Sequence, residues 1–480
     1  MIQRADELMP GLLQTVRPWI SNLLLCILGV GLTYLSGRFV SEHTHYTALG
    51  ISGIAAWSVA LYILAVIVAL TQPTNRWSYG IILVFAFASR LQPILTEPFS
   101  STDIYRYVWD GIVQHAHINP YRYVPADLAL KFLRAPHQHI YDNINRKDYA
   151  RTIYPPVAQM VYFLASWISP TVLTMKTVMA GFECVAVAAI SLTLQRLGRP
   201  GAQVLLYAWC PLLVWEISGA GHIDAAVIGF VSLAILFRVR GSPVLTGLFL
   251  GLAVMTKFYP LVLFPALYRR GDWKMPATLA TVVATGYAIY SSVGMQVFGF
   301  LGGYTEEEGM TTGSRYFLLQ WAQSLRGLQS FSPNVYIAFC GLVFLAITIW
   351  AWIYATKEGA IPKMQSLAVV TKPNFLKAGA ISAFALMLLF SPHYPWYIVW
   401  LVPFFALAPS LPLITYLMAF FYLFTTSLAI PGPGLFLLNK IMYGGILCAG
   451  LLQFAVQRWP VYRRFSFLRS SASIESPRVD

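Results

Sequence analysis

Apolar segments long enough to cross a lipid bilayer recur along most of this chain, and the polar stretches between them are mostly short. Hydrophobic residues fill 57% of the 480 positions and charged residues only 11%, whereas a soluble domain carries about 25% charge. Such a chain spends its length on membrane spans rather than on a water-soluble core. The sequence therefore predicts an all-α, polytopic transmembrane helical bundle of about 12–14 spans.

The basic residues predict how the chain is oriented. The net charge is +14, but Lys and Arg are scattered through short loops instead of forming a stripe with aromatic residues, so no nucleic-acid partner is expected. The positive-inside rule explains them. It predicts both termini in the cytoplasm and two long external loops, residues 96–154 and 302–333. The predicted domain covers residues 1–465, and residues 466–480 are expected to form a disordered cytoplasmic tail.

The segment after the first long loop is too long for one membrane helix, and Ser169-Pro170 interrupts it. Arg196 and Arg199 favour the cytoplasm at its far end, so it should cross the membrane once. We expect Pro155 to Ile168 to form a short helix in the outer leaflet, with the crossing from about Thr171 to Leu194.

The first long loop opens on a polar segment, Ser100 to Gly111, that carries two carboxylates. If this segment is helical, Asp103, Arg106 and Asp110 share one face, because their offsets are zero, three and seven. Asp103 is then a candidate general base, and Arg106 a candidate to orient it or to meet phosphate. Two structural alternatives stay open: Asp103 as a helix N-cap, and Arg106 with Asp110 as an i,i+4 ion pair.

Several motifs together resemble a known family. They are Thr102-Asp103 followed by Tyr105 to Gly111, then Asn119-Pro120-Tyr121, Ile153-Tyr154-Pro155-Pro156, Gly221-His222-Ile223-Asp224, Gly247 to Lys257, and Ser391-Pro392-His393-Tyr394-Pro395-Trp396-Tyr397. The chain resembles polytopic glycosyltransferases of the GT-C class over about residues 77 to 410, and in particular the bacterial mannosyltransferases that use polyprenyl-phosphate-mannose. It departs from many members by two extra predicted crossings before the first long loop.

The resemblance implies an inverting glycosyltransferase of the bacterial cytoplasmic membrane. Its donor would be a polyprenyl-phosphate-linked sugar, its acceptor a lipid or a glycan, and membrane lipids would surround it. The active site would lie on the extracytoplasmic face, with Asp103 as the base. The chemistry agrees, because a sugar leaving from phosphate needs little protonation, so one carboxylate suffices.

The remaining candidate residues lie in segments predicted to reach the same external face. Lys257 is the first candidate for the donor phosphate, although an ammonium there could also extend to the lipid headgroups. The other phosphate candidates are Arg106, Arg315 and His393, with Arg151 as a rival. Six residues are candidates for sugar or acceptor binding: Asp110, His222, Asp224, Glu216, Tyr154 and Tyr397. For Asp110, the alternative is the ion pair with Arg106. For His222 and Asp224, the alternative to ligand binding is helix capping. Glu216 is a candidate to support the residues that contact the substrate.

The sequence disfavours two further kinds of site, a metal site and a nucleotide-binding site. Glu306, Glu307 and Glu308 offer oxygen ligands, but three adjacent acids point in different directions, so a solvated acidic loop is favoured over a metal site. No P-loop and no strand followed by GxGxxG is present, which disfavours a nucleotide-sugar donor. No cofactor is therefore predicted. A flippase for a lipid-linked saccharide and an envelope polysaccharide polymerase or ligase remain alternative functions.

Overall fold

The computed structural model describes residues 18–43, 48–98, 100–357, 373–427 and 434–458, and regular structure in these ranges is entirely helical. The all-α fold predicted from the apolar segments is therefore confirmed. The predicted tail, residues 466–480, and the ends of both termini lie outside the described residues.

Three long helices open the described chain: α2 (Pro18–His43), α3 (Ala48–Thr71) and α4 (Arg76–Leu95). α2 packs against both α3 and α4. α4 begins sharply because the Asn75 side chain accepts hydrogen bonds from the backbone N–H groups of Trp77 and Ser78, at 2.9 and 3.1 Å. The Ser78 hydroxyl accepts a hydrogen bond from the Asn75 backbone N–H, which completes a capping box.

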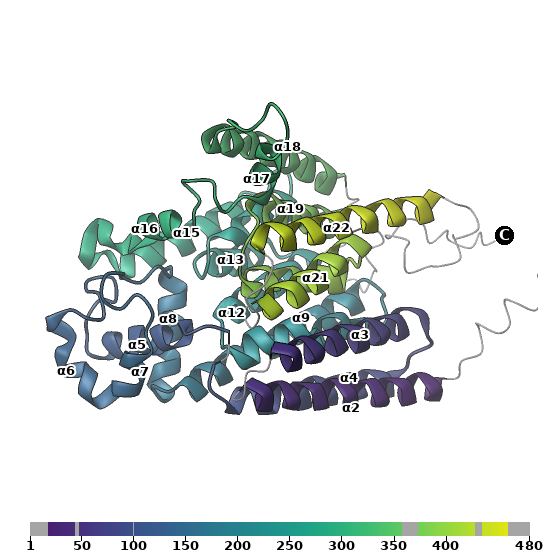
Figure 1. Ribbon diagram of the computed structural model, residues 1–480, viewed down its shortest axis with the longest axis horizontal. Coiled ribbons are helices and arrows are strands. Elements are labelled where there is room, and N and C mark those ends of the chain that lie inside the picture. Colours follow the sequence, from purple (N-terminus) through teal and green to yellow (C-terminus); the bar gives the residue numbers. More distant parts are fainter. Residues whose placement is uncertain (1–17, 44–47, 99, 358–372, 428–433, 459–480) are drawn as a thin grey trace, which may run out of the picture.

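The first long loop folds into short helices. They are α5 (Asp103–His115), η1 (Leu128–Leu130), α6 (Lys131–Arg134), η2 (Ala135–His137) and α7 (Gln138–Asp142). Two helices follow, α8 (Pro156–Ile168) and α9 (Val172–Arg196), with bounds close to those predicted. α8 packs against α5. α5, α8 and α16 lie at one end of the molecule, and α2, α3 and α4 extend from there toward the opposite end (Figure 1).

The next apolar segment, residues 201–219, is not one continuous helix. It is broken into η3 (Gly201–Val204), α10 (Leu205–Ala208), α11 (Pro211–Leu213) and a π-helix, η4 (Val214–Gly219). Pro211 lacks the N–H that would continue the helix. Just before this break, the Ala208 carbonyl accepts a hydrogen bond from Arg90 at 2.8 Å. Arg90 also forms a buried bidentate pair with Glu183 of α9, which holds the break in place.

The rest of the chain alternates long helices with short ones. The elements are α12 (Asp224–Val239), α13 (Pro243–Val254), η5 (Tyr259–Leu263), α14 (Phe264–Leu267), α15 (Lys274–Ile289), η6 (Ser291–Phe298), α16 (Leu301–Glu307), α17 (Phe317–Gln323), α18 (Pro333–Thr356), α19 (Asn374–Phe390), η7 (Pro395–Leu401), α20 (Val402–Leu407), α21 (Leu411–Ser427) and α22 (Leu435–Arg458). The apolar stretch that begins with α15 is thus interrupted after Ile289.

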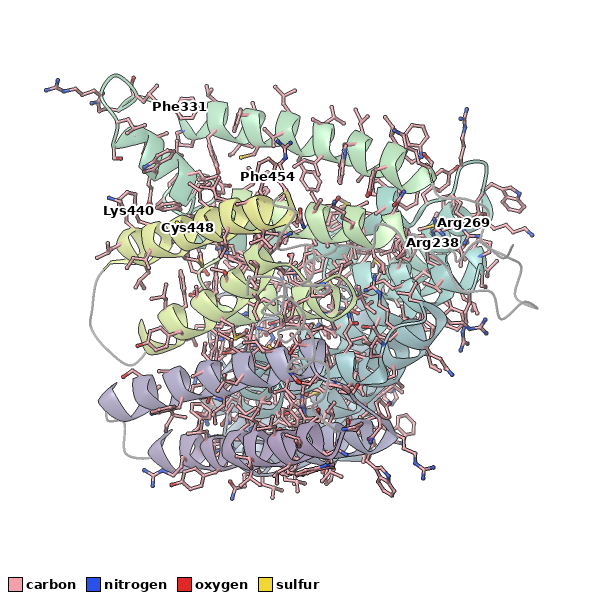
Figure 2. The ribbon with its side chains drawn as sticks, turned by 90° about the vertical axis from the view of Figure 1, so that its right-hand side faces the viewer. Arg238, Arg269, Phe331, Lys440, Cys448 and Phe454 are labelled. Carbon is pink, nitrogen blue, oxygen red and sulfur yellow. The ribbon has the colours of Figure 1, made fainter. Side chains whose placement is uncertain are left out.

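Six helices within the described ranges are long and apolar enough to cross a membrane: α2, α3, α4, α9, α18 and α22. Five shorter apolar helices accompany them. Large apolar side chains such as Phe454 of α22 remain exposed on this bundle, as a lipid-facing surface requires (Figure 2). The architecture is that of a polytopic membrane protein, and the predicted count of 12–14 crossings stays a prediction.

Candidate active site

One cavity of about 620 Å³ lies at the end of the molecule that carries α5 and α8. Four segments far apart in the sequence line it: residues 100–106, 145–155, 257–259 and 300–310, joined by the aromatic residues Tyr394, Trp396 and Tyr397. We call this space the central cavity. It contains five of the predicted site residues, namely Asp103, Arg106, Tyr154, Lys257 and Tyr397.

Asp103 is the first residue of α5, and its side chain lines the central cavity. The N-cap position belongs to Thr102, which makes no side-chain capping bond, so Asp103 does not serve as the N-cap. Its Oδ1 accepts a hydrogen bond from the Asn145 amide at 2.7 Å. No other hydrogen bond to this carboxylate occurs within the described residues, which leaves Oδ2 available to a ligand.

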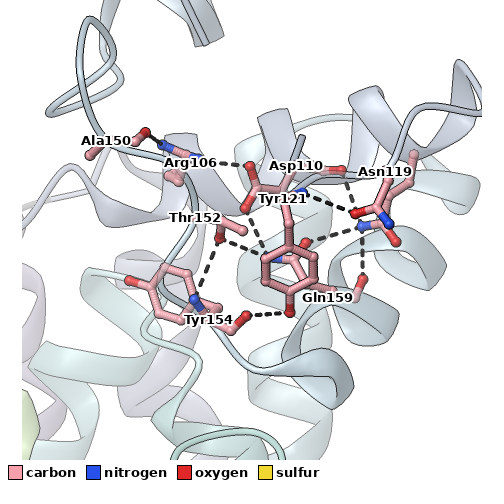
Figure 3. Close-up of polar contacts among 9 residues, drawn as sticks. Arg106, Asp110, Asn119, Tyr121, Ala150, Thr152, Tyr154 and Gln159 are labelled. Atoms are coloured by element: carbon pink, nitrogen blue, oxygen red, sulfur yellow. Dashed lines mark hydrogen bonds and ion pairs between the residues drawn. The ribbon is translucent and has the colours of Figure 1, made fainter. Parts of the chain in front are cut away.

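Arg106 and Asp110 form the ion pair that the helical spacing allows, with Nε and Oδ1 2.7 Å apart and both side chains buried. Arg106 also donates to the Ala150 carbonyl at 3.0 Å. The other oxygen of Asp110 accepts from the Gln159 amide at 3.0 Å, and that amide also donates to Thr152 (Figure 3). This network ties α5 to α8 and to the chain before it. Asp110 does not line the cavity.

Lys257 reaches the central cavity but is already paired. Its ammonium lies 2.6 Å from Oδ2 of buried Asp224, whose Oδ1 accepts from the Tyr259 hydroxyl at 2.7 Å. The ammonium also lies 5.5 Å from the centroid of the Tyr397 ring. Asp224 therefore fixes Lys257 from behind the cavity, and Lys257 still exposes 14% of its side chain.

Arg315 and His393 lie beside the central cavity without lining it. Arg315 is buried, pairs with Glu308 and sits 5.5 Å from the centroid of the Tyr397 ring. The His393 imidazole is 3.3 Å from the Arg315 carbonyl oxygen. Burial, followed by the charge of Arg315, lowers the pKa of His393, so its imidazole is neutral at neutral pH. Neither side chain is placed to hold a phosphate in the cavity.

Glu216 and His222 are fully buried behind the cavity wall. Glu216 accepts from the Ser100 hydroxyl at 2.8 Å, and the His222 ring stacks on Trp396 with centroids 4.3 Å apart. Burial, followed by the charge of Lys257, lowers the pKa of His222 well below its usual value. Because the imidazole is neutral, its 3.5 Å approach to Glu216 is not an ion pair. Both residues lie outside the cavity and contact residues that line it, Ser100 and Trp396.

Asn145 and Arg146 line the cavity but were not among the predicted site residues. They belong to a polar run in the first long loop, which carried no signal of its own for their proximity to Asp103. Arg146 pairs with Glu307 of α16, with Nε and Oε2 2.7 Å apart. Of the cationic side chains that line the cavity, Arg151 alone has no carboxylate partner among the described residues. Its Nε donates to the Arg122 carbonyl at 3.2 Å.

The triplet Glu306 to Glu308 is divided between two ion pairs, because Glu307 binds Arg146 and Glu308 binds Arg315. Within the described ranges, no three His, Cys, Asp or Glu side chains come together as a metal site would require.

Comparison with known families adds the activity class. The family model described as alpha-(1->6)-mannopyranosyltransferase, N-terminal domain, matches residues 11–269, and that of glycosyltransferase family 87 matches residues 152–392. No curated protein and no solved structure matches the chain. Each family match covers just over half of the 480 residues. The chain therefore belongs with the alpha-(1->6)-mannopyranosyltransferases and glycosyltransferase family 87, and it is a polytopic membrane glycosyltransferase of the GT-C type.

Proposed function

We propose that this protein transfers a sugar, most simply mannose, from a polyprenyl-phosphate donor to a hydroxyl of a lipid or glycan acceptor, with inversion at the anomeric carbon. The observation that carries the proposal is the content of the central cavity: a carboxylate with one oxygen unpaired, Asp103, shares it with the cations Arg151 and Lys257. A base and an anion-binding group in one cavity are what transfer from a phosphate requires.

In the proposed reaction, the Asp103 carboxylate takes the proton of the acceptor hydroxyl as that oxygen attacks the anomeric carbon. The attack comes from the face opposite the phosphate, so the configuration inverts. The bond between the anomeric carbon and the phosphate oxygen breaks, and polyprenyl phosphate leaves with the bonding electrons. A phosphate leaving group needs no second acid, unlike the alcohol that leaves in glycoside hydrolysis.

Arg151 is the strongest candidate for the phosphate, because its guanidinium is not neutralised by a carboxylate in the described structure. A guanidinium can bind phosphate through two parallel hydrogen bonds. Lys257 would contribute a second charge, directed by Asp224. Phe258 and Leu301 give the same cavity apolar walls, which suit an isoprenoid chain better than a nucleotide.

The distribution of arginines supports an external cavity. α12 begins beside the cavity at Asp224 and ends at Val239, about 24 Å away at 1.5 Å per residue. Arg238 and Arg269 meet at this far end, where Arg269 donates to the Arg238 carbonyl at 3.1 Å (Figure 2). By the positive-inside rule that end is cytoplasmic, so the cavity faces outward.

The test is a transfer assay with the purified full-length protein in liposomes. Radiolabelled polyprenyl-phosphate-mannose of defined anomeric configuration is supplied with an alkyl mannoside acceptor, and GDP-mannose replaces the donor in a parallel reaction. We expect a new mannoside of inverted configuration from the lipid donor alone. Retained configuration, or equal use of GDP-mannose, would contradict the proposal. Movement of the lipid across the membrane without a new glycosidic bond would identify a flippase instead.

Mass spectrometry of envelope glycolipids from cells with and without the protein identifies the natural product. We expect one glycolipid to lose a single hexose when the protein is absent. An unchanged glycolipid profile together with a negative transfer assay would leave the proposed reaction without support.

A further inference from the structure

Asn145 supplies the hydrogen bond that orients the proposed base. Its amide nitrogen lies 2.7 Å from Oδ1 of Asp103, and the two residues are brought together from the first long loop and the start of α5. An amide N–H₂ group is a neutral donor, so it fixes one carboxylate oxygen without neutralising the charge. The other oxygen can then point to a substrate hydroxyl.

The residue after Asn145 holds an unfavourable backbone conformation. Arg146 has φ of +54°, in the left-handed region that residues with a Cβ rarely adopt. Such a conformation persists only where surrounding contacts enforce it. Here the Ala150 N–H bonds to the Arg146 carbonyl at 3.0 Å, and the Ala150 carbonyl accepts from Arg106. The chain from 145 to 150 is thus fixed at its far end to α5.

Its near end is fixed to the second long loop. The Arg146 guanidinium pairs with Glu307 of α16 and lies 5.8 Å from the centroid of the Tyr304 ring. The Tyr304 hydroxyl in turn bonds to that of Tyr397. Glycines with positive φ, Gly299 at +56° and Gly309 at +67°, stand just outside the two ends of α16. α16 therefore joins the chain at positions where a side chain would be strained.

We infer that Asn145 is a positioning residue for Asp103, and that the Arg146–Glu307 pair holds Asn145 in place, so that the seating of α16 sets the orientation of the base. This inference rests on the proposed function. It assigns the second long loop a part in preparing Asp103 for the acceptor, in addition to enclosing the cavity.

The first experiment measures kcat and KM of mannose transfer for Asn145→Ala and Asn145→Asp. Removing a hydrogen bond to a charged group should lower kcat about tenfold to a hundredfold and change KM less. Asn143→Ala is the matched control, since that exposed side chain only donates to the His139 carbonyl, and it should behave as wild type.

The second experiment tests the link to α16 with Glu307→Gln. The pair is about one-third exposed, so kcat should fall only about twofold to fivefold. Combined with Asn145→Ala, Glu307→Gln should cause no further loss, because both act through one contact. Independent, multiplying losses would overturn the link, and so would an unchanged rate for Glu307→Gln.

The outcomes separate this inference from the proposed function. Wild-type kcat and KM in both Asn145 variants, with activity abolished in Asp103→Asn, would overturn the positioning role and leave the transfer mechanism standing. Full activity of Asp103→Asn would overturn the mechanism itself. Because Asn145→Asp keeps the size of the side chain, it remains informative if Asn145→Ala does not fold. Wild-type kinetics in Asn145→Asp would then alone contradict the inference.

Discussion

Two carboxylates on the same face of α5 have opposite surroundings. Asp103 begins the helix, lines the central cavity and has one neutral hydrogen-bond partner, Asn145. Asp110 lies two turns later, is 2% exposed, and has one oxygen on Arg106 and the other on Gln159. One carboxylate keeps an oxygen for a ligand, whereas the other has both oxygens occupied by the protein.

The comparison shows that position along one helix face can separate chemistry from structure. Both residues share the spacing that predicts a common face, so spacing alone assigns them the same role. The hydrogen-bond partners of the two carboxylates, however, assign them different roles. A carboxylate held by a buried guanidinium contributes to stability and has no oxygen free to accept a proton from a substrate, while a carboxylate in a cavity can act as a base.

The largest expected effect is on catalysis, from Asp103→Asn. General base catalysis contributes about 10²–10⁴-fold to a rate, so kcat for mannose transfer should fall by that factor. Thermal unfolding in detergent should change little, because the asparagine replaces a carboxylate with only one neutral partner. If the variant is inactive and its melting temperature is also far below that of the wild type, Asp103 does not differ from Asp110 in the way proposed.

Asp110→Asn should show the reverse pattern, a loss of stability first. Removing the charge leaves the buried Arg106 guanidinium without its ion-pair partner, which costs about 3–5 kcal/mol. The melting temperature in detergent measures this loss. The double variant Arg106→Gln/Asp110→Asn removes both charges and should recover part of it. If the single variant melts like wild type and loses only activity, Asp110 belongs to the reaction rather than to the scaffold.

Arg151 and Lys257, two of the cations that line the cavity, extend the same comparison to smaller effects. Arg151→Gln should raise KM for polyprenyl-phosphate-mannose about tenfold to a hundredfold, the value of hydrogen bonds to a charged group, with unchanged melting. Lys257→Gln should lower the melting temperature as well, since it leaves buried Asp224 unpaired. Arg151→Lys is the control, and its KM should lie between those of the wild type and Arg151→Gln. Equal melting and equal KM for the two glutamine variants would contradict the distinction.

Local signals in the sequence predict the apolar helices and mark the polar segment that carries Asp103, which the structure places in the cavity. Apolar runs predict α8 and α9 within a few residues, and the polar segment before Gly111 stands out among the apolar ones. Pro211 is a local sign of the break after Ala208, but the group that satisfies the Ala208 carbonyl, Arg90, lies 118 residues away in the sequence. Asn145 was missed for the same reason, since 42 residues separate it from Asp103. Long-range polar contacts decide both.

His393 gives the smallest expected effect and tests whether lying near the cavity is enough for function. The sequence places it among the phosphate candidates, but its imidazole contacts the Arg315 carbonyl and does not line the cavity. Because burial lowers its pKa, it carries no charge that could attract phosphate at neutral pH. His393→Gln keeps a hydrogen-bonding group, so KM and kcat should stay within about threefold of wild type. A tenfold rise in donor KM would instead place this imidazole in contact with the phosphate, which requires Arg315 and its carbonyl to move when the donor binds.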